Sequence, residues 1–138
     1  MNLRHFISGL LIVTSFVACK RNEPTPVDVA GKGGNASIEV TPKHHVRYID
    51  SCIVYLKYNT LDMPSVIFDA SKYDESIKCT KINDSACVGT FTSLKKGNYY
   101  MYGVGWDKKG PYVVTGGRSL TITGDSTYHI VLAVSEGD

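Results

Sequence analysis

Short runs of alternating apolar and polar residues, separated by turn residues, are the feature that most limits how this chain can fold. A period of two is typical of a strand with one buried face, because successive side chains point to opposite sides of a sheet. Turn residues recur about every eight to twelve positions, and no convincing helical period appears. Strands are predicted at residues 37–41, 48–58, 65–68, 77–82, 87–92, 99–106, 112–115, 119–123 and 128–134, with a helical turn at 70–75.

Composition and turn spacing together predict the fold class. Nine tyrosines, thirteen glycines and few strong helix formers are typical of an all-β protein. We therefore predict a Greek-key β-sandwich of about seven to nine short antiparallel strands. Alternation predicts that Cys52, Val54 and Leu56 share one face of their strand. It also predicts that the last strand has one face with Tyr128, Ile130, Leu132 and Val134. Pro42 should end the first strand and place it at an edge.

The segment Leu94-Lys95-Lys96-Gly97-Asn98-Tyr99 reads as a corner between strands. Gly97 can take a positive φ, so the chain can turn there, and Tyr99 can then pack back on the turn. This segment resembles the Leu-x-Pro-Gly-x-Tyr corner of the prealbumin-like and carboxypeptidase-regulatory-like sandwich domains of Bacteroidota lipoproteins, with Lys96 in place of the proline. The resemblance covers about residues 36–135 and implies a fold rather than an activity.

The first residues are typical of an export signal. Arg4 precedes an apolar run from Phe6 to Val17, which is shorter than the ~20 residues that a membrane-spanning helix needs. Ala18-Cys19 at its end resembles the lipobox of bacterial lipoproteins. That resemblance implies cleavage before Cys19 and acylation of this cysteine, with chains such as palmitate holding the protein on a membrane that it does not cross.

The predicted organisation has three parts, a signal peptide, a tether and one domain. The signal peptide covers residues 1–18, a lipid-anchored flexible linker covers 19–35, and the sandwich domain covers 36–138. Lys20 rather than aspartate follows the cysteine, which resembles outer-membrane lipoproteins of the cell envelope. Both the periplasmic and the outer face stay open as locations.

Charge and motifs exclude several functions. The formal net charge is +2, or +1 once Arg4 leaves with the signal peptide, so charge does not indicate a nucleic-acid partner. No nucleophile elbow, HExxH motif or phosphate-binding loop occurs, and we expect no enzyme activity, no catalytic residues and no cofactor. His44 and His45 could not face one metal ion from a regular strand, although they could from a loop. We therefore expect solvated loop histidines and no metal site.

Three cysteines remain in the mature chain, in a compartment that permits disulfides. A turn near Asn83 would bring the flanking segments face to face, which favours a Cys79–Cys87 bridge. Pairing of Cys52 with Cys79 or Cys87 is an alternative, as are three reduced and buried thiols.

One predicted strand carries aromatic residues on a single face. Tyr100, Tyr102 and Trp106 alternate with the face that holds Tyr99. The aromatic residues either pack in the core or lie outside, where they could bind an envelope protein or stack on a glycan. The sequence therefore favours a non-enzymatic, lipid-anchored interaction or accessory module, with a carbohydrate-binding surface lipoprotein as the alternative.

Overall fold

The structure is a computed structural model that describes residues 29–82 and 86–137. The predicted signal peptide, Cys19 and the first part of the linker lie outside the described residues. In the part that is described, no helix has the length and apolar character needed to cross a lipid bilayer.

Most of the described chain is in strands, as the alternating pattern predicts. The elements in order are β1 (Lys32–His44), β2 (Arg47–Tyr48), β3 (Ser51–Tyr58), the short 3-10 helix η1 (Ala70–Lys72), β4 (Glu75–Ile82), β5 (Ala86–Leu94), β6 (Gly97–Asp107), β7 (Tyr112–Ile122) and β8 (Thr127–Glu136). The strand predicted at 65–68 instead belongs to the loop between β3 and β4. The two strands predicted at 112–115 and 119–123 form the single strand β7, which continues through its paired glycines.

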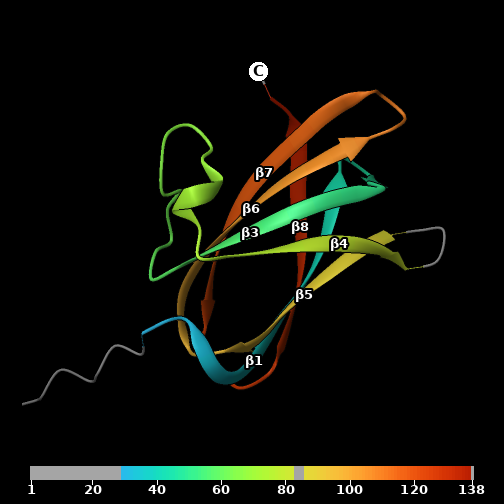
Figure 1. Ribbon diagram of the computed structural model, residues 1–138. Helices are drawn as coiled ribbons and strands as arrows, with labels where there is room; N and C mark the ends of the chain where they lie inside the picture. The colour runs from blue at the N-terminus through green and yellow to red at the C-terminus, as the bar shows by residue number, and fades with distance from the viewer. Residues whose placement is uncertain (1–28, 83–85, 138) are drawn as a thin grey trace, which may run out of the picture.

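The all-β class is confirmed, but the two-sheet sandwich is wrong. The strand order is β2-β1-β5-β4-β3-β6-β7-β8, and β1 also pairs with β8, so that the sheet closes into a β-barrel. In Figure 1, β3, β6 and β7 cross the front of the molecule while β8 and β1 cross behind them. The closing ladder is parallel and runs from Ser37–Thr127 to His44–Val134, whereas the other pairings are antiparallel.

Strand β1 is therefore a central strand rather than the edge strand predicted from Pro42. On one side it pairs with β8, and on the other it pairs with β5 up to Val40 and with β2 from Lys43 onward. Pro42 lies between the β5 ladder and the β2 ladder. Neither strand pairs with residue 42, so the missing N–H of the proline costs no ladder hydrogen bond on that side of β1. The chain consequently continues as a strand to His44.

The predicted corner is confirmed. Gly97 has φ 139°, and Tyr99 is fully buried with its hydroxyl donating to the carbonyl oxygen of Lys95 at 2.7 Å. The same hydroxyl accepts from the backbone N–H of Gly31 at 3.0 Å. The ordered fold therefore begins before the predicted boundary at residue 36, because the corner tyrosine binds the chain that enters β1.

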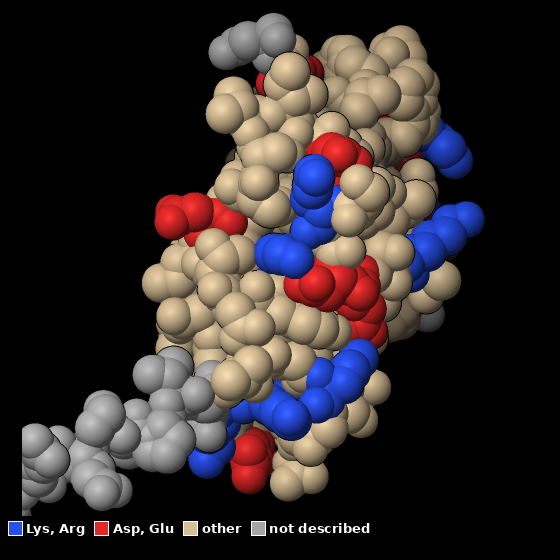
Figure 2. Space-filling view, turned by 60° about the vertical axis from the view of Figure 1, so that its left-hand side comes forward, with Lys and Arg blue, Asp and Glu red and all other residues tan. Residues whose placement is uncertain are grey.

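The residues that alternation groups on one face of β3 and of β8 point into the interior and are buried, apart from the half-buried Tyr128. The barrel interior is filled by aliphatic side chains, three cysteines and two large aromatic rings, and its buried hydrophobic residues are Ala30, Ala36, Ile38, Val40, Ile49, Cys52, Val54, Leu56, Cys79, Cys87, Phe91, Leu94, Tyr99, Met101, Val114, Ile122, Ile130, Leu132 and Val134. Figure 2 shows basic and acidic side chains interspersed over one face of the molecule. On that face the small net charge is not gathered into a single basic patch.

Candidate metal centre

Three strands with the same direction end together at one end of the barrel. β1 and β8 are parallel neighbours, and β6 shares their direction because β7, which lies between β6 and β8, is antiparallel to both. The last residues of these strands are His44, Glu136 and Asp107. The topology therefore brings one imidazole and two carboxylates together from distant parts of the sequence.

His44 is the buried centre of this cluster. Its side chain is 1% exposed, with Nδ1 2.8 Å from Oδ2 of Asp107 and Nε2 3.1 Å from Oε2 of Glu136. Asp107 is itself fixed, because Arg47 Nη2 donates to its Oδ2 at 3.1 Å and the backbone N–H of Lys109 donates to its Oδ1 at 2.9 Å. The orientation of the His44 ring is thus set from the side opposite Glu136.

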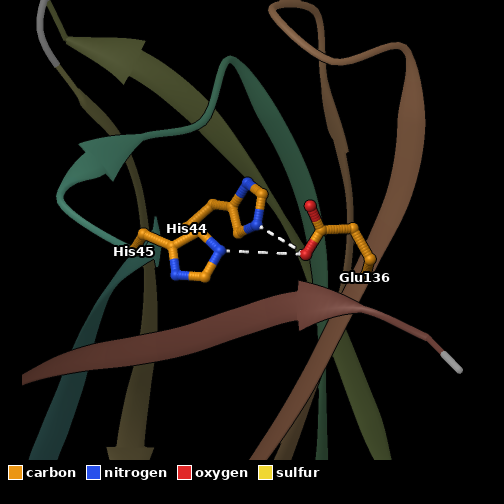
Figure 3. A group of neighbouring side chains, drawn as sticks. All are labelled: His44, His45 and Glu136. Atoms are coloured by element: carbon orange, nitrogen blue, oxygen red, sulfur yellow. Dashed lines mark hydrogen bonds and ion pairs between the residues drawn. The ribbon is translucent and has the colours of Figure 1, made fainter.

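His45 lies beside His44 because the strand ends between them. Its φ of 52° is in the left-handed region, so the alternation of a regular strand does not apply to it. The two ring centroids are 4.4 Å apart, and His45 Nε2 is 3.8 Å from the Glu136 oxygen that His44 also contacts. Figure 3 shows both rings directed toward that one carboxylate.

The charges of the cluster shift its protonation equilibria. The hydrogen bond to Asp107, followed by the interaction with Glu136, raises the pKa of His44 above its ordinary value of 6.5, although burial opposes this change. The hydrogen bond from His44 lowers the pKa of Asp107, with the Lys109 N–H and the Arg47 charge adding to it. The pKa of Glu136 is lowered by a backbone hydrogen bond and then by His44.

The arrangement offers three metal-binding atoms at the barrel end. His44 Nε2, His45 Nε2 and a Glu136 carboxylate oxygen all lie within 4.8 Å of one another. Asp107 contacts the other nitrogen of the buried imidazole. A carboxylate that binds the second nitrogen of a histidine is the usual outer partner of a histidine that ligates a metal ion.

Sequence reasoning missed this cluster for two separate reasons. His44 is buried, contrary to the prediction of a solvated histidine, although it continues the inward face of Ile38, Val40 and Pro42 and could have been recognised from that pattern. Its partners Asp107 and Glu136 lie far away in sequence and reach it only through barrel closure. The prediction that His45 is exposed is confirmed, and His129 is exposed as well.

The predicted aromatic face points outward, which excludes the reading in which it fills the core. Tyr99 and Met101 on the opposite face of β6 are fully buried. Tyr102 is covered by the loop between β3 and β4, where its ring stacks on Phe68 with centroids 5.0 Å apart. Tyr100 is half-buried, and its hydroxyl lies over the backbone of Gly117.

Trp106 is the member of this face that stays accessible. Its side chain is 41% exposed, and it borders a shallow depression of about 310 Å³ that Ile53, Val104 and Val113 also line. The structure therefore separates the aromatic residues of β6 into a covered part and an open part around Trp106.

The three described cysteines are buried and form no bridge in the structure. The strand register disfavours the predicted Cys79–Cys87 bridge. The β4–β5 hairpin pairs Lys81 with Cys87 and Thr80 with Val88. Cys79 is therefore two residues out of register with Cys87 rather than opposite it. The predicted hairpin is confirmed by this pairing, whereas the predicted turn at residues 83–85 lies outside the described residues.

Comparisons with known proteins leave the site to be interpreted from its own geometry. No family model, no curated protein and no solved structure matches this chain.

Proposed function

We propose that this protein is a non-enzymatic module of the cell envelope that binds a divalent transition-metal ion of the Zn²⁺ class. The observation that carries the proposal is the convergence of His44, His45 and Glu136, with Asp107 behind the buried imidazole. His44 Nε2 and His45 Nε2 would donate nitrogen and Glu136 would donate oxygen. Imidazole and carboxylate donors suit zinc, copper and nickel, whereas Mg²⁺ and Ca²⁺ prefer oxygen donors throughout.

The distances between the donor atoms fit such an ion. Zinc lies about 2.0–2.2 Å from histidine nitrogens and carboxylate oxygens, which places tetrahedral donors about 3.3 Å apart. The Glu136 oxygen is 3.1 Å from His44 Nε2 and 3.8 Å from His45 Nε2. Only the His45 ring needs to shift appreciably, and it is exposed and lies past the end of β1.

A binding role is favoured over a hydrolytic one by the state of the nearby carboxylates. Asp107 is engaged by His44, Arg47 and a backbone N–H, and Glu136 is itself a donor to the ion. Neither carboxylate is left to act as a general base toward a water on the ion. The ion would instead hold a partner or stabilise the fold.

Metal binding is tested by titrating Zn²⁺ into the chelator-treated full chain and measuring heat or competition with a chromophoric chelator. We expect one ion per chain, with affinity at least tenfold lower in His45→Ala and in Glu136→Gln. The matched control is His129→Ala. His129 Nδ1 lies 2.9 Å from Glu39 Oε1 in a surface pair that is separate from this cluster. Unchanged zinc affinity in both His45→Ala and Glu136→Gln would overturn the proposal.

The envelope location rests on the lipobox-like sequence at Cys19. Two or more acyl chains make anchoring stable where one chain is marginal. We expect the mature protein from membranes to have the mass of an acylated chain that begins at Cys19, and Cys19→Ser to release it from the membrane fraction. A mass that retains Met1, without lipid, would contradict the anchor and leave the metal proposal standing.

Carbohydrate binding is the second candidate, and the exposure of Trp106 is the observation that favours it. An indole beside a shallow apolar depression can stack on a sugar ring. The test compares retention of the full chain and of Trp106→Ala on a glycan array. Tyr112→Ala is the control, since Tyr112 is similarly exposed but does not line this depression. Equal retention of both variants, or no retention of the full chain, would exclude this function.

A further inference from the structure

Three cysteine side chains meet inside the barrel at neighbouring strands. Cys52 in β3, Cys79 in β4 and Cys87 in β5 are each at most 2% exposed. The strand order β5-β4-β3 places Cys79 on the middle strand. Any bridge to a direct neighbouring strand must therefore use Cys79.

Strand register distinguishes the two possible partners of Cys79. Cys52 and Cys79 are directly opposite each other in the β3–β4 ladder. Opposite residues in antiparallel strands have Cα atoms roughly 4.5–5.5 Å apart, inside the roughly 4.4–6.8 Å range of disulfides. Cys87 is opposite Lys81, so it is a diagonal neighbour of Cys79, and diagonal separations of roughly 7–8 Å exceed that range.

Two glycines, Gly89 in β5 and Gly103 in β6, lie beside the sulfur atoms on the outer neighbouring strands. A Cβ added at Gly89 would lie 3.0 Å from Cys79 Sγ, and one added at Gly103 would lie 3.2 Å from Cys52 Sγ. The sulfur atoms of Cys52 and Cys79 thus lie in positions where the neighbouring strands have no side chain.

We propose that Cys52 and Cys79 form the single internal disulfide of the domain and that Cys87 stays a buried thiol. Formation of the Sγ–Sγ bond removes one proton from each thiol and two electrons from the pair. A small-molecule or protein disulfide accepts these electrons and is reduced to two thiols. The inference is independent of the metal centre, whose residues it does not include.

The thiols are protected once the barrel has folded. The neighbouring Cys52 thiol and burial raise the pKa of Cys79 to about 12. Contact with Cys79 and burial also raise the pKa of Cys87. Because the thiolate is the form that attacks disulfides, exchange is slow in the closed barrel and bond formation belongs to the folding stage.

The test refolds the full chain, carrying Cys19→Ser to remove the fourth thiol, in a buffer of reduced and oxidised glutathione. Free thiols are then alkylated under denaturing conditions without reductant, and the protein is cut with trypsin. Cleavage after Arg47, Lys57, Lys78 and Lys81 places each cysteine in a different peptide. Mass spectrometry then identifies the pair directly.

We expect the peptide of Cys52 to be linked to that of Cys79, with one alkylated thiol at Cys87. The Cys87→Ala variant should keep the link, and the Cys79→Ser variant should contain no link. Three results would each overturn the proposal. They are a Cys79–Cys87 link, three alkylated thiols, and a Cys52–Cys87 link in the parent chain or in its Cys79→Ser variant. The Cys87→Ala result keeps the test decisive if Cys79→Ser folds poorly.

Discussion

The hydroxyl of Tyr99 shows how one buried polar atom holds two distant parts of the chain. It donates to the carbonyl oxygen of Lys95, which precedes β6, and accepts from the N–H of Gly31, which precedes β1. A buried backbone N–H that loses its acceptor destabilises a fold by about 1–3 kcal/mol. Tyr99 therefore fixes the start of β1 through a polar contact as well as through its buried ring.

Replacement of Tyr99 by phenylalanine should lower the free energy of unfolding by roughly 1–3 kcal/mol, since the ring remains while the Gly31 N–H loses its partner. Urea denaturation followed by fluorescence measures the change. Tyr48→Phe is the control, because Tyr48 is 47% exposed. Equal stability of the Tyr99→Phe variant and the native chain would show that water replaces the hydroxyl.

The protonation of His44 predicts how the stability of the metal-free protein depends on pH. Its pKa is raised in the folded state, so its contribution is fully present below the unfolded pKa of about 6.5 and is lost as pH rises through the higher folded value. The lowered pKa values of Asp107 and Glu136 act oppositely, and their contribution is lost only as pH falls through these values.

We therefore expect the urea midpoint of the chelator-treated chain to fall as pH rises above the ordinary histidine pKa of about 6.5 and through the raised pKa of His44. His44→Gln should flatten this dependence, whereas His129→Ala should leave it unchanged. A dependence that persists in His44→Gln would assign it to another group.

At the scale of elements, the contact between β7 and β8 depends on a missing side chain. The two strands share only the pairs Val114–Glu136 and Thr115–Ser135 within the described ladder. Immediately beyond these pairs, a Cβ at Gly116 would lie 2.0 Å from the carbonyl oxygen of Ala133. This close approach explains why position 116 is a glycine, and β7 continues past it because its ladder with β6 is unbroken.

Gly116→Ala should destabilise the fold by roughly 1–3 kcal/mol or more, because the clash is with backbone that cannot rotate away. The control is Gly124→Ala, where an added Cβ meets nothing closer than the Tyr128 hydroxyl at 3.8 Å. Thermal unfolding monitored by circular dichroism compares the two. Similar melting temperatures for both variants would mean that β7 and β8 separate easily.

Local patterns and long-range pairing differed in how well they could be predicted. The inward faces of β3 and β8, the corner at Tyr99 and the β4–β5 hairpin follow from alternation and turn chemistry within short windows. The β1–β8 ladder joins the two ends of the domain and has no local signal. The sandwich prediction and the missed contact between His44 and Glu136 fail for the same reason, because both depend on that ladder.

At the scale of the whole molecule, the proposed metal site connects the elements that close the barrel. His44 ends β1 and Glu136 ends β8, and these strands form the parallel closing ladder. An ion that binds both residues only in the folded state stabilises that state by mass action. The site thus links metal occupancy to closure of the sheet.

Zinc at about one hundred times its dissociation constant should raise the free energy of unfolding by about 2.7 kcal/mol. Calorimetry should show this as a higher melting temperature in the native chain and in His129→Ala, and a clearly smaller rise in His45→Ala. A rise of equal size in His45→Ala would place the stabilising ion elsewhere.

The direction of β1 determines where the proposed metal site would lie relative to a membrane that holds Cys19. β1 has a bulged start, in which Lys32 and Ala36 both face Leu94, and its regular part from Ile38 to His44 spans about 20 Å at roughly 3.3 Å per residue. With a lipid on Cys19, the entry end of the barrel would be membrane-proximal, and the imidazoles would be presented at the distal tip. Ions or ligands arriving from the aqueous side would then reach the site without first approaching the lipid headgroups.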